Sequence, residues 1–194
     1  MKNWVWLWVI SFGVIAVWSG CEDPRREEVS ADTLSFEARL AFEEDTINQF
    51  IQEQGYDSVF VTSNGLRIVP ILEGNGNATL PGDIISVFYI GSFLNGRVFD
   101  TNSEDAALDA GIFVEGNDYL PLTRNLGDDS LIEGWNEGLS YMDEKSKAIL
   151  IMPSHLAYGA AGFGSTFDSD DNIVQVVGPF RVLKFEVSLV KIRR

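Results

Sequence analysis

The chain has 194 residues, of which 45% are hydrophobic, and its 29 acidic and 14 basic residues give a formal net charge of −15. This length suits one ordinary globular domain, and the apolar fraction excludes a disordered acidic tail. The charge argues against nucleic acid as a partner, because phosphate binding needs clustered cations. One cysteine and one histidine exclude an intrachain disulfide and the zinc sites that need several such residues.

The start of the chain predicts an export signal. Met1–Asn3 carries a positive charge, and Trp4–Trp18 follows without a charged residue. This run is shorter than the about 20 apolar residues of a stable transmembrane helix, but it has the length and flanks of a secretory signal. Ser19–Cys21 then places two small residues before the only cysteine, which resembles the lipobox of bacterial lipoproteins. The resemblance implies that Cys21 is lipidated; the alternative is an ordinary cleaved signal followed by a chance cysteine.

These features predict an exported protein that is lipid-anchored to a bacterial envelope membrane and faces the periplasm or the cell surface. Residues 1–20 are the predicted lipoprotein signal peptide. Residues 21–33 are charged and nearly free of large apolar side chains, which predicts a flexible tether. An N-terminal helix and hairpin extension is expected over 34–79, and the main domain over 80–194.

The extension begins with helical patterns and continues with strands. Apolar residues are scattered over 34–42, and a better helix is expected from Asp45, as its N-cap, to a stop at Gly55. Two β-rich runs follow at 58–62 and 66–72, and the Asn-Gly pair between them is a hairpin signal.

The main domain alternates strands with one short helix. A helix is predicted at 131–142, despite two glycines, and long surface loops at 101–119 and 153–178. Strands are predicted at 83–90, 97–99, 146–152 and 182–192, the first two joined by a hairpin at Asn95-Gly96. This pattern predicts an α+β class with a mostly antiparallel sheet and one short crossing helix.

The sequence lacks the usual signatures of cofactor chemistry. No glycine-rich nucleotide motif is present, and no G-x-S-x-G motif supports a triad around His155, which is expected to be a surface-loop residue. The acidic run 168–172 superficially resembles a calcium loop. Ile173 and Pro179, however, stand where a glycine and a bidentate Glu are needed. We therefore expect neither a metal nor a cofactor.

Five separated segments form an ordered set that is specific in combination, although each is weak alone. The segments are Val87–Gly91, Asn95–Asp100, Leu131–Leu139 with Met142, Ile151–Gly159 and Leu183–Val187. Together they resemble the FKBP family of peptidyl-prolyl cis-trans isomerases, over about residues 80–194.

The resemblance implies a curved antiparallel sheet wrapped around one short helix, with an apolar pocket between them. It implies Trp135 as the floor of this pocket, and Asp100 and Tyr158 as its polar groups. The backbone N–H of Ile132 is expected to bind a carbonyl of the ligand. Leu122 and Phe163 depart from the Phe and His that many members carry at these positions. The catalytic residues that the resemblance implies are Phe99, Asp100, Trp135 and Tyr158, and the substrate-binding residues are Tyr89, Leu122, Leu131, Ile132, Phe163, Val176, Val177 and Phe185.

The implied function is prolyl isomerisation that assists the folding of exported proteins, without a covalent intermediate or a cofactor. The implied ligands are proline-containing segments of those proteins and macrolide inhibitors, and the lipid anchor brings the chain to a membrane. Two alternatives use the same fold differently. One is a catalytically weak binding module or chaperone, and the other is a subunit of an envelope or motility complex.

Overall fold

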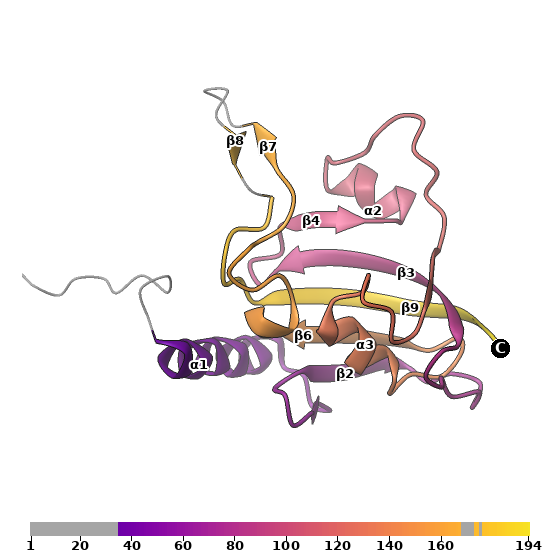
Figure 1. The fold of residues 1–194 in the computed structure, drawn as a ribbon, viewed down its shortest axis with the longest axis horizontal. Coiled ribbons are helices and arrows are strands. Elements are labelled where there is room, and N and C mark those ends of the chain that lie inside the picture. The colour runs from indigo at the N-terminus through magenta and orange to yellow at the C-terminus, as the bar shows by residue number, and fades with distance from the viewer. Residues whose placement is uncertain (1–34, 168–172, 175) are drawn as a thin grey trace, which may run out of the picture.

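A curved seven-stranded antiparallel sheet wraps around a short helix in the computed structural model, which describes residues 35–167, 173–174 and 176–194 (Figure 1). The strand order is β1-β2-β6-β9-β3-β4, and β5 pairs with β3. The predicted α+β class and curved sheet are confirmed. The predicted signal, the tether and Cys21 lie outside the described residues.

The elements have the following bounds. The helices are α1 (Phe36–Gln54), α2 (Glu104–Asp109) and α3 (Glu133–Leu139), with a 3-10 turn at Ser154–Leu156. The strands are β1 (Phe60–Val61), β2 (Arg67–Leu72), β3 (Ile84–Phe93), β4 (Val98–Thr101), β5 (Leu122–Asn125), β6 (Lys147–Met152), β7 (Thr166–Phe167), β8 (Ile173–Val174) and β9 (Leu183–Arg193).

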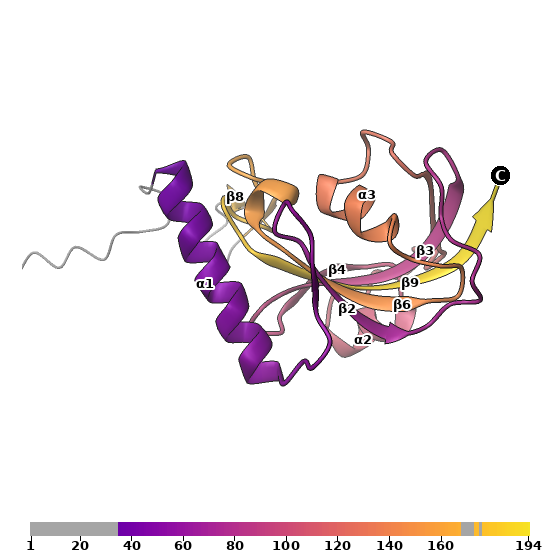
Figure 2. The same cartoon turned by 90° about the horizontal axis from the view of Figure 1, so that it is seen from below.

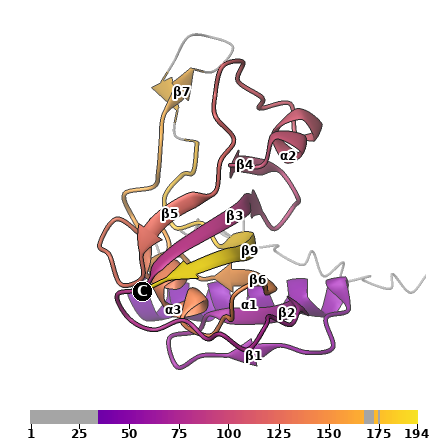
Figure 3. The same cartoon turned by 90° about the vertical axis from the view of Figure 1, so that its right-hand side faces the viewer.

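Strand β9 lies at the centre of the sheet, between β6 and β3. Leu183, Phe185, Val187 and Leu189 alternate with more exposed residues and point into the main core. Irregular pairing of β3 with β9 between Ser86 and Val87, and with β4 at its other end, increases the local twist. β5 pairs with the first part of β3, along the same edge that β4 pairs with further on (Figure 3). The sheet therefore bends around α3.

Two glycines allow α3 to lie close against the sheet. A Cβ at Gly138 would be 2.6 Å from Leu150 Cδ1, and a Cβ at Gly134 would be 2.7 Å from Met152 Sδ. Both distances are far shorter than an ordinary van der Waals contact, so both positions need a residue without a Cβ. The close approach places the intervening Trp135, which is 4% exposed, in the main core between helix and sheet.

Helix α1 packs against one end of the opposite face of the sheet. Neighbouring residues of β6 point to opposite sides: Leu150 packs in the main core, whereas Ile149 and Ile151 pack against Ile47 and Phe50 of α1 in a second, smaller core. Figure 2 shows α1 at one end of the sheet and α3 across its concave side. Helix α3 therefore packs on one face of the sheet and α1 on the other, near the C-terminal end of β6.

The structure corrects the expected start of this helix. α1 is one continuous helix capped by Ser35, whose hydroxyl accepts the N–H of Ala38, and Asp45 lies in its middle rather than at an N-cap. The predicted stop at Gly55 is confirmed, since this residue has a φ of 67° and ends the helix in the left-handed conformation. The first half was not predicted as part of this helix because its buried face there carries Arg39 and Glu43 instead of apolar residues.

Both predicted hairpins form, and the first is built into the main sheet. β1 pairs with β2, β2 also pairs with β6, and Leu66 and Ile68 belong to the main core. The hairpin of the expected extension therefore shares the sheet and the core of the main domain. The loop predicted at 101–119 contains α2, whose Ala107 is buried, and the loop predicted at 153–178 contains the 3-10 turn and the β7–β8 pair.

Candidate active site

A hollow of about 290 Å³ opens between α3, the concave face of the sheet and the loops after β6. β3, β4, β5 and β9 supply its sheet side, and the turn before α3 supplies its rim. The segment after β6 closes the remaining side. The lining residues are Tyr89, Asp100, Leu122, Arg124, Ser130, Leu131, Ile132, Trp135, Tyr158, Phe163 and Phe185.

Three aromatic rings form the inner part of this hollow. The Trp135 ring meets Tyr89 at 5.0 Å and Phe185 at 5.4 Å between centroids, both nearly edge-to-face. This geometry is the preferred one for aromatic pairs and fixes the indole in place. Among the residues that the structure describes, the buried indole N–H of Trp135 has no hydrogen-bond partner. The prediction of an apolar hollow with Trp135 at its floor therefore agrees with this geometry.

A carboxylate and two phenols give the hollow its polarity. The hydroxyl of Tyr89 donates to Oδ2 of Asp100 at 2.8 Å. Burial, and then the nearby Asp100, raise the pKa of Tyr89 well above its usual value, and the same causes raise the pKa of Tyr158 to about 12. Both phenols therefore keep their protons at neutral pH and can donate hydrogen bonds.

The ring of Tyr158 stacks on Phe163, with centroids 4.5 Å apart and planes 16° from parallel. Phe163 is held by a two-way backbone bridge to Val177, with N–O distances of 2.8 and 2.9 Å. The stack limits rotation of the Tyr158 ring, so its hydroxyl has a defined direction. Phe163 thus lines the hollow and also orients a polar group.

Hydrogen bonds with Thr101, the last residue of β4, and with Asn102 hold the backbone of Tyr89. The Asn102 side chain accepts the Tyr89 N–H at 2.7 Å and donates to Val87 O at 2.9 Å, while the Thr101 hydroxyl donates to Tyr89 O at 2.6 Å. These bonds occupy the backbone groups of Tyr89 and therefore fix the direction of its side chain. Sequence reasoning missed Asn102 and Thr101, since their partners lie on another strand.

Three predicted site residues do not line the hollow. Phe99 is 8% exposed and packs behind Phe185, with ring centroids 5.7 Å apart. Val177 is turned into the main core by its pairing with Phe163, and Val176 lines a separate groove that includes Phe180. These positions support the wall from behind or lie beside it.

Two lining residues were not predicted, Arg124 and Ser130. Arg124 follows Leu122 by two residues on β5, so both point to the same side of the strand. Recognising a strand at 122–125 would have indicated Arg124. Ser130 lies in the turn before α3, and no local sequence pattern indicates its place.

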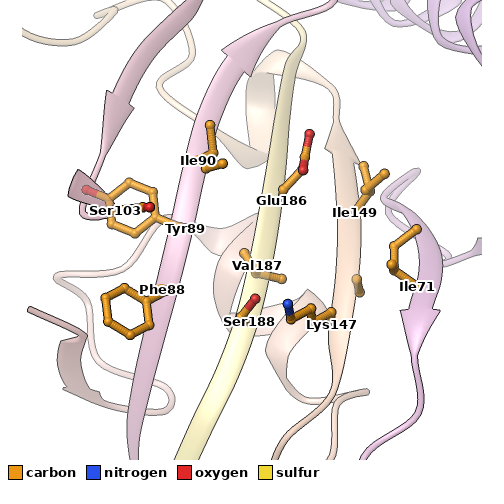
Figure 4. Close-up of a pocket in the computed structure, with 11 residues that line it drawn as sticks. Ile71, Phe88, Tyr89, Ile90, Ser103, Lys147, Ile149, Glu186, Val187 and Ser188 are labelled. Carbon is orange, nitrogen blue, oxygen red and sulfur yellow. The ribbon is translucent and has the colours of Figure 1, made fainter. Parts of the chain in front are cut away.

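A second hollow, of about 220 Å³, lies on the opposite face of the sheet (Figure 4). Phe88 and Ile90 of β3, Glu186 of β9, and Lys147 and Ile149 of β6 line it from neighbouring strands. Tyr89 also borders this hollow, but neither Trp135 nor Asp100 is among the residues that line it. The concave side is therefore the better candidate for the active site.

Comparison with known proteins decides the family. Residues 76–190 match the family model described as FKBP-type peptidyl-prolyl cis-trans isomerase. The chain belongs to this family. This chain is 34% identical to an FK506-binding protein of Neisseria meningitidis over 128 residues, which are 66% of this chain and 96% of that protein. It is accordingly a peptidyl-prolyl cis-trans isomerase, as its sequence predicted.

Solved structures agree with the FKBP-type fold. FkpA from Escherichia coli matches with a TM-score of 0.57 and 27% identity, over 81% of this chain and 62% of that one. A peptidyl-prolyl cis-trans isomerase from Pseudomonas syringae matches with a TM-score of 0.56 and 25% identity, over 83% of this chain and 98% of that one. Within the described part of the FKBP-type chain, no helix is long and apolar enough to cross a bilayer.

Proposed function

We propose that this isomerase acts on proline-containing segments of exported proteins, from a lipid anchor at Cys21, and that the hollow floored by Trp135 is its active site. The observation that carries the site is the joint placement of an aromatic floor with Asp100 and two protonated phenols at one opening. The family's reaction is rotation about a prolyl peptide bond, and the lining residues offer it an apolar floor and hydrogen-bond donors.

The energetics suit such a hollow. Rotation about a peptide bond faces a barrier of about 18–20 kcal/mol, because amide resonance is lost in the twisted state. The twisted amide has less charge separation than the planar one, so an apolar environment favours it relative to water. Each tenfold acceleration needs about 1.4 kcal/mol of such differential stabilisation. Shape, desolvation and one or two hydrogen bonds can supply several such factors.

The residues have distinct roles in this proposal. The proline ring lies on Trp135, between Tyr89 and Phe185. The Tyr158 hydroxyl and the backbone N–H of Ile132 hold carbonyls on either side of the rotating bond. Ile132 is the N-cap of α3, so its own N–H precedes the intrahelical hydrogen bonds and can serve the ligand.

Asp100 orients the twisted amide and sets the field of the hollow, with Tyr89 holding its carboxylate. FK506 is proposed to occupy the same hollow, as the name of the Neisseria relative suggests. Leu122 contributes an aliphatic wall where many members carry Phe. Because FK506 and the peptide would occupy the same hollow, FK506 should inhibit peptide isomerisation competitively.

The site is tested by peptide isomerisation with Asp100→Ala and Trp135→Ala, with Asp105→Ala as the matched control on exposed α2. Both site variants should lower kcat/KM by at least about tenfold, since each removes a group that contacts the twisted amide. The control should match the wild type. Wild-type rates in both site variants, with folding verified by circular dichroism, would remove the site assignment.

The anchor is tested separately in cells. Acyl chains on Cys21 would contribute about 0.8 kcal/mol per buried CH₂ to membrane binding. Cys21→Ser should abolish incorporation of labelled fatty acid and leave the N-terminus unacylated by mass spectrometry. An unchanged acylation pattern would show that Cys21 is not the modified residue, without affecting the proposal for the active site.

A further inference from the structure

A buried carboxylate ties α1 to the turn that leads into the active site. Glu43 is only 2% exposed, although burying a carboxylate without partners is costly. Its Oε2 accepts the backbone N–H of Ser154 at 2.7 Å, and its Oε1 accepts the Ser154 hydroxyl at 2.6 Å. Two short bonds to a charged acceptor fix both the position and the orientation of this turn. Figure 2 shows the turn beside α1.

Ser154 in turn fixes the backbone on both sides of Tyr158 through hydrogen bonds to its carbonyl. The carbonyl of Ser154 accepts the N–H groups of Ala157 and Gly159 at 3.0 and 2.9 Å, and these residues flank Tyr158 directly. Gly159 has a φ of 54°, a left-handed conformation that other residues adopt rarely. The backbone on both sides of Tyr158 is therefore set from one residue, and that residue is set by Glu43.

Arg39 braces the same segment from the other side. It lies one turn before Glu43 on the same face of α1, and its guanidinium carbon is 3.2 Å from the ring centroid of Phe180. The Phe180 N–H donates to Gly159 O at 2.8 Å. Both braces come from α1, which precedes the segment 76–190 that matches the family.

We propose that Glu43 is a positioning residue for prolyl isomerisation: it holds Ser154 so that the Tyr158 hydroxyl points into the hollow. This inference rests on the role proposed above for Tyr158. It makes α1 a part of the catalytic apparatus, because the helix carries the carboxylate that sets a substrate-binding group.

The test uses the full chain in detergent and measures kcat and KM with a prolyl peptide. Glu43→Ala should lower kcat/KM on the order of tenfold, chiefly through kcat, because small displacements of a catalytic group are costly. Glu43→Gln should stay near the wild type. Its amide oxygen can accept the Ser154 N–H, and its NH₂ can donate to the hydroxyl, which rotates to suit.

Glu44→Ala is the matched control, since Glu44 is the next residue on α1 and pairs with Arg67 on β2 instead of the turn. This variant should leave kcat unchanged. The free energy of unfolding of every variant is also measured in urea, so that catalytic losses are compared at known stability.

The decisive measurement is a double-mutant cycle with Tyr158→Phe. If Glu43 acts through Tyr158, Glu43→Ala should slow the wild type but add little to the loss in Tyr158→Phe. Additive losses, a wild-type rate in Glu43→Ala, or an equal loss in Glu44→Ala would overturn the inference. If Glu43→Ala fails to fold, Ser154→Ala replaces it in the cycle, because this variant removes only the hydroxyl bond. Additive losses or a wild-type rate in Ser154→Ala would overturn the inference in the same way.

The cycle also separates this inference from the proposed site. A wild-type rate in Tyr158→Phe would refute the role of Tyr158 and, with it, the role of Glu43. A slow Tyr158→Phe together with a fully active Glu43→Ala would refute the positioning role alone.

Discussion

Replacing Gly138 by alanine should destabilise the protein, although the same change stabilises most helices. Alanine gains about 1 kcal/mol over glycine inside a helix. In α3, however, the new Cβ would lie 2.6 Å from Leu150 Cδ1 and 2.8 Å from Cδ2, and Leu150 is fully buried. Overpacking of a filled core costs about 1–3 kcal/mol. With two methyl groups compressed, the packing cost should lie near the upper end of this range, and the gain in helix propensity then leaves a net loss of about 2 kcal/mol in the free energy of unfolding.

The assay is urea unfolding followed by far-UV circular dichroism, with Gly134→Ala for comparison. A Cβ at Gly134 would meet mainly the end of the Met152 side chain, which is unbranched and adapts more easily, so its loss should be smaller. Leu150→Ala makes room at the crowded contact. The double variant Gly138→Ala/Leu150→Ala should therefore lose less stability than the sum of the single changes. A Gly138→Ala protein as stable as the wild type would refute the close-packing argument.

Three further changes test other parts of the structure. Gly91→Ala would place a Cβ 2.8 Å from carbons of two packed phenylalanine rings, so it should cost about 1–3 kcal/mol in urea unfolding; an unchanged midpoint would contradict this. Because the pKa of Tyr158 is raised from 10.0 to about 12, the folded chain holds this proton more tightly than the unfolded chain. The free energy of unfolding should then fall between about pH 10 and 12, and fall less in Tyr158→Phe; equal slopes would argue against the shift. Tyr89→Phe removes the donor to Asp100 and should cost on the order of 1 kcal/mol in unfolding while lowering kcat/KM; an unaltered rate would mean that this bond does not position the carboxylate.

The strands and hairpins could be predicted because their signals are local. The alternation over residues 182–192 and the Asn-Gly turns reflect the two-residue period of half-buried strands. β5 escaped prediction because Leu122 is the only large apolar residue in it. The sequence predicts the end of α1 at Gly55 but not its start at Phe36, because Arg39 and Glu43 occupy the buried face of its first half, where an apolar pattern is expected.

The candidate site followed from its resemblance to a family rather than from periodicity. Trp135, Asp100 and Tyr158 come from three separate segments, and only the fold brings them to one hollow. The bond between Glu43 and Ser154 joins residues 111 positions apart. No sequence window contains such a pair, so contacts of this kind become visible only in three dimensions.

The position of β9 has a consequence for how the chain matures. Every other strand of the main sheet precedes β9 in the chain, yet β9 alone joins the group β1, β2 and β6 to the group β3, β4 and β5. Until the ribosome has made residues 183–193, the two groups are separate half-sheets with open edges. A nascent chain of this order cannot complete its sheet until β9 is available, which would suit the proposed export, since a polypeptide must thread through a translocation channel before it folds.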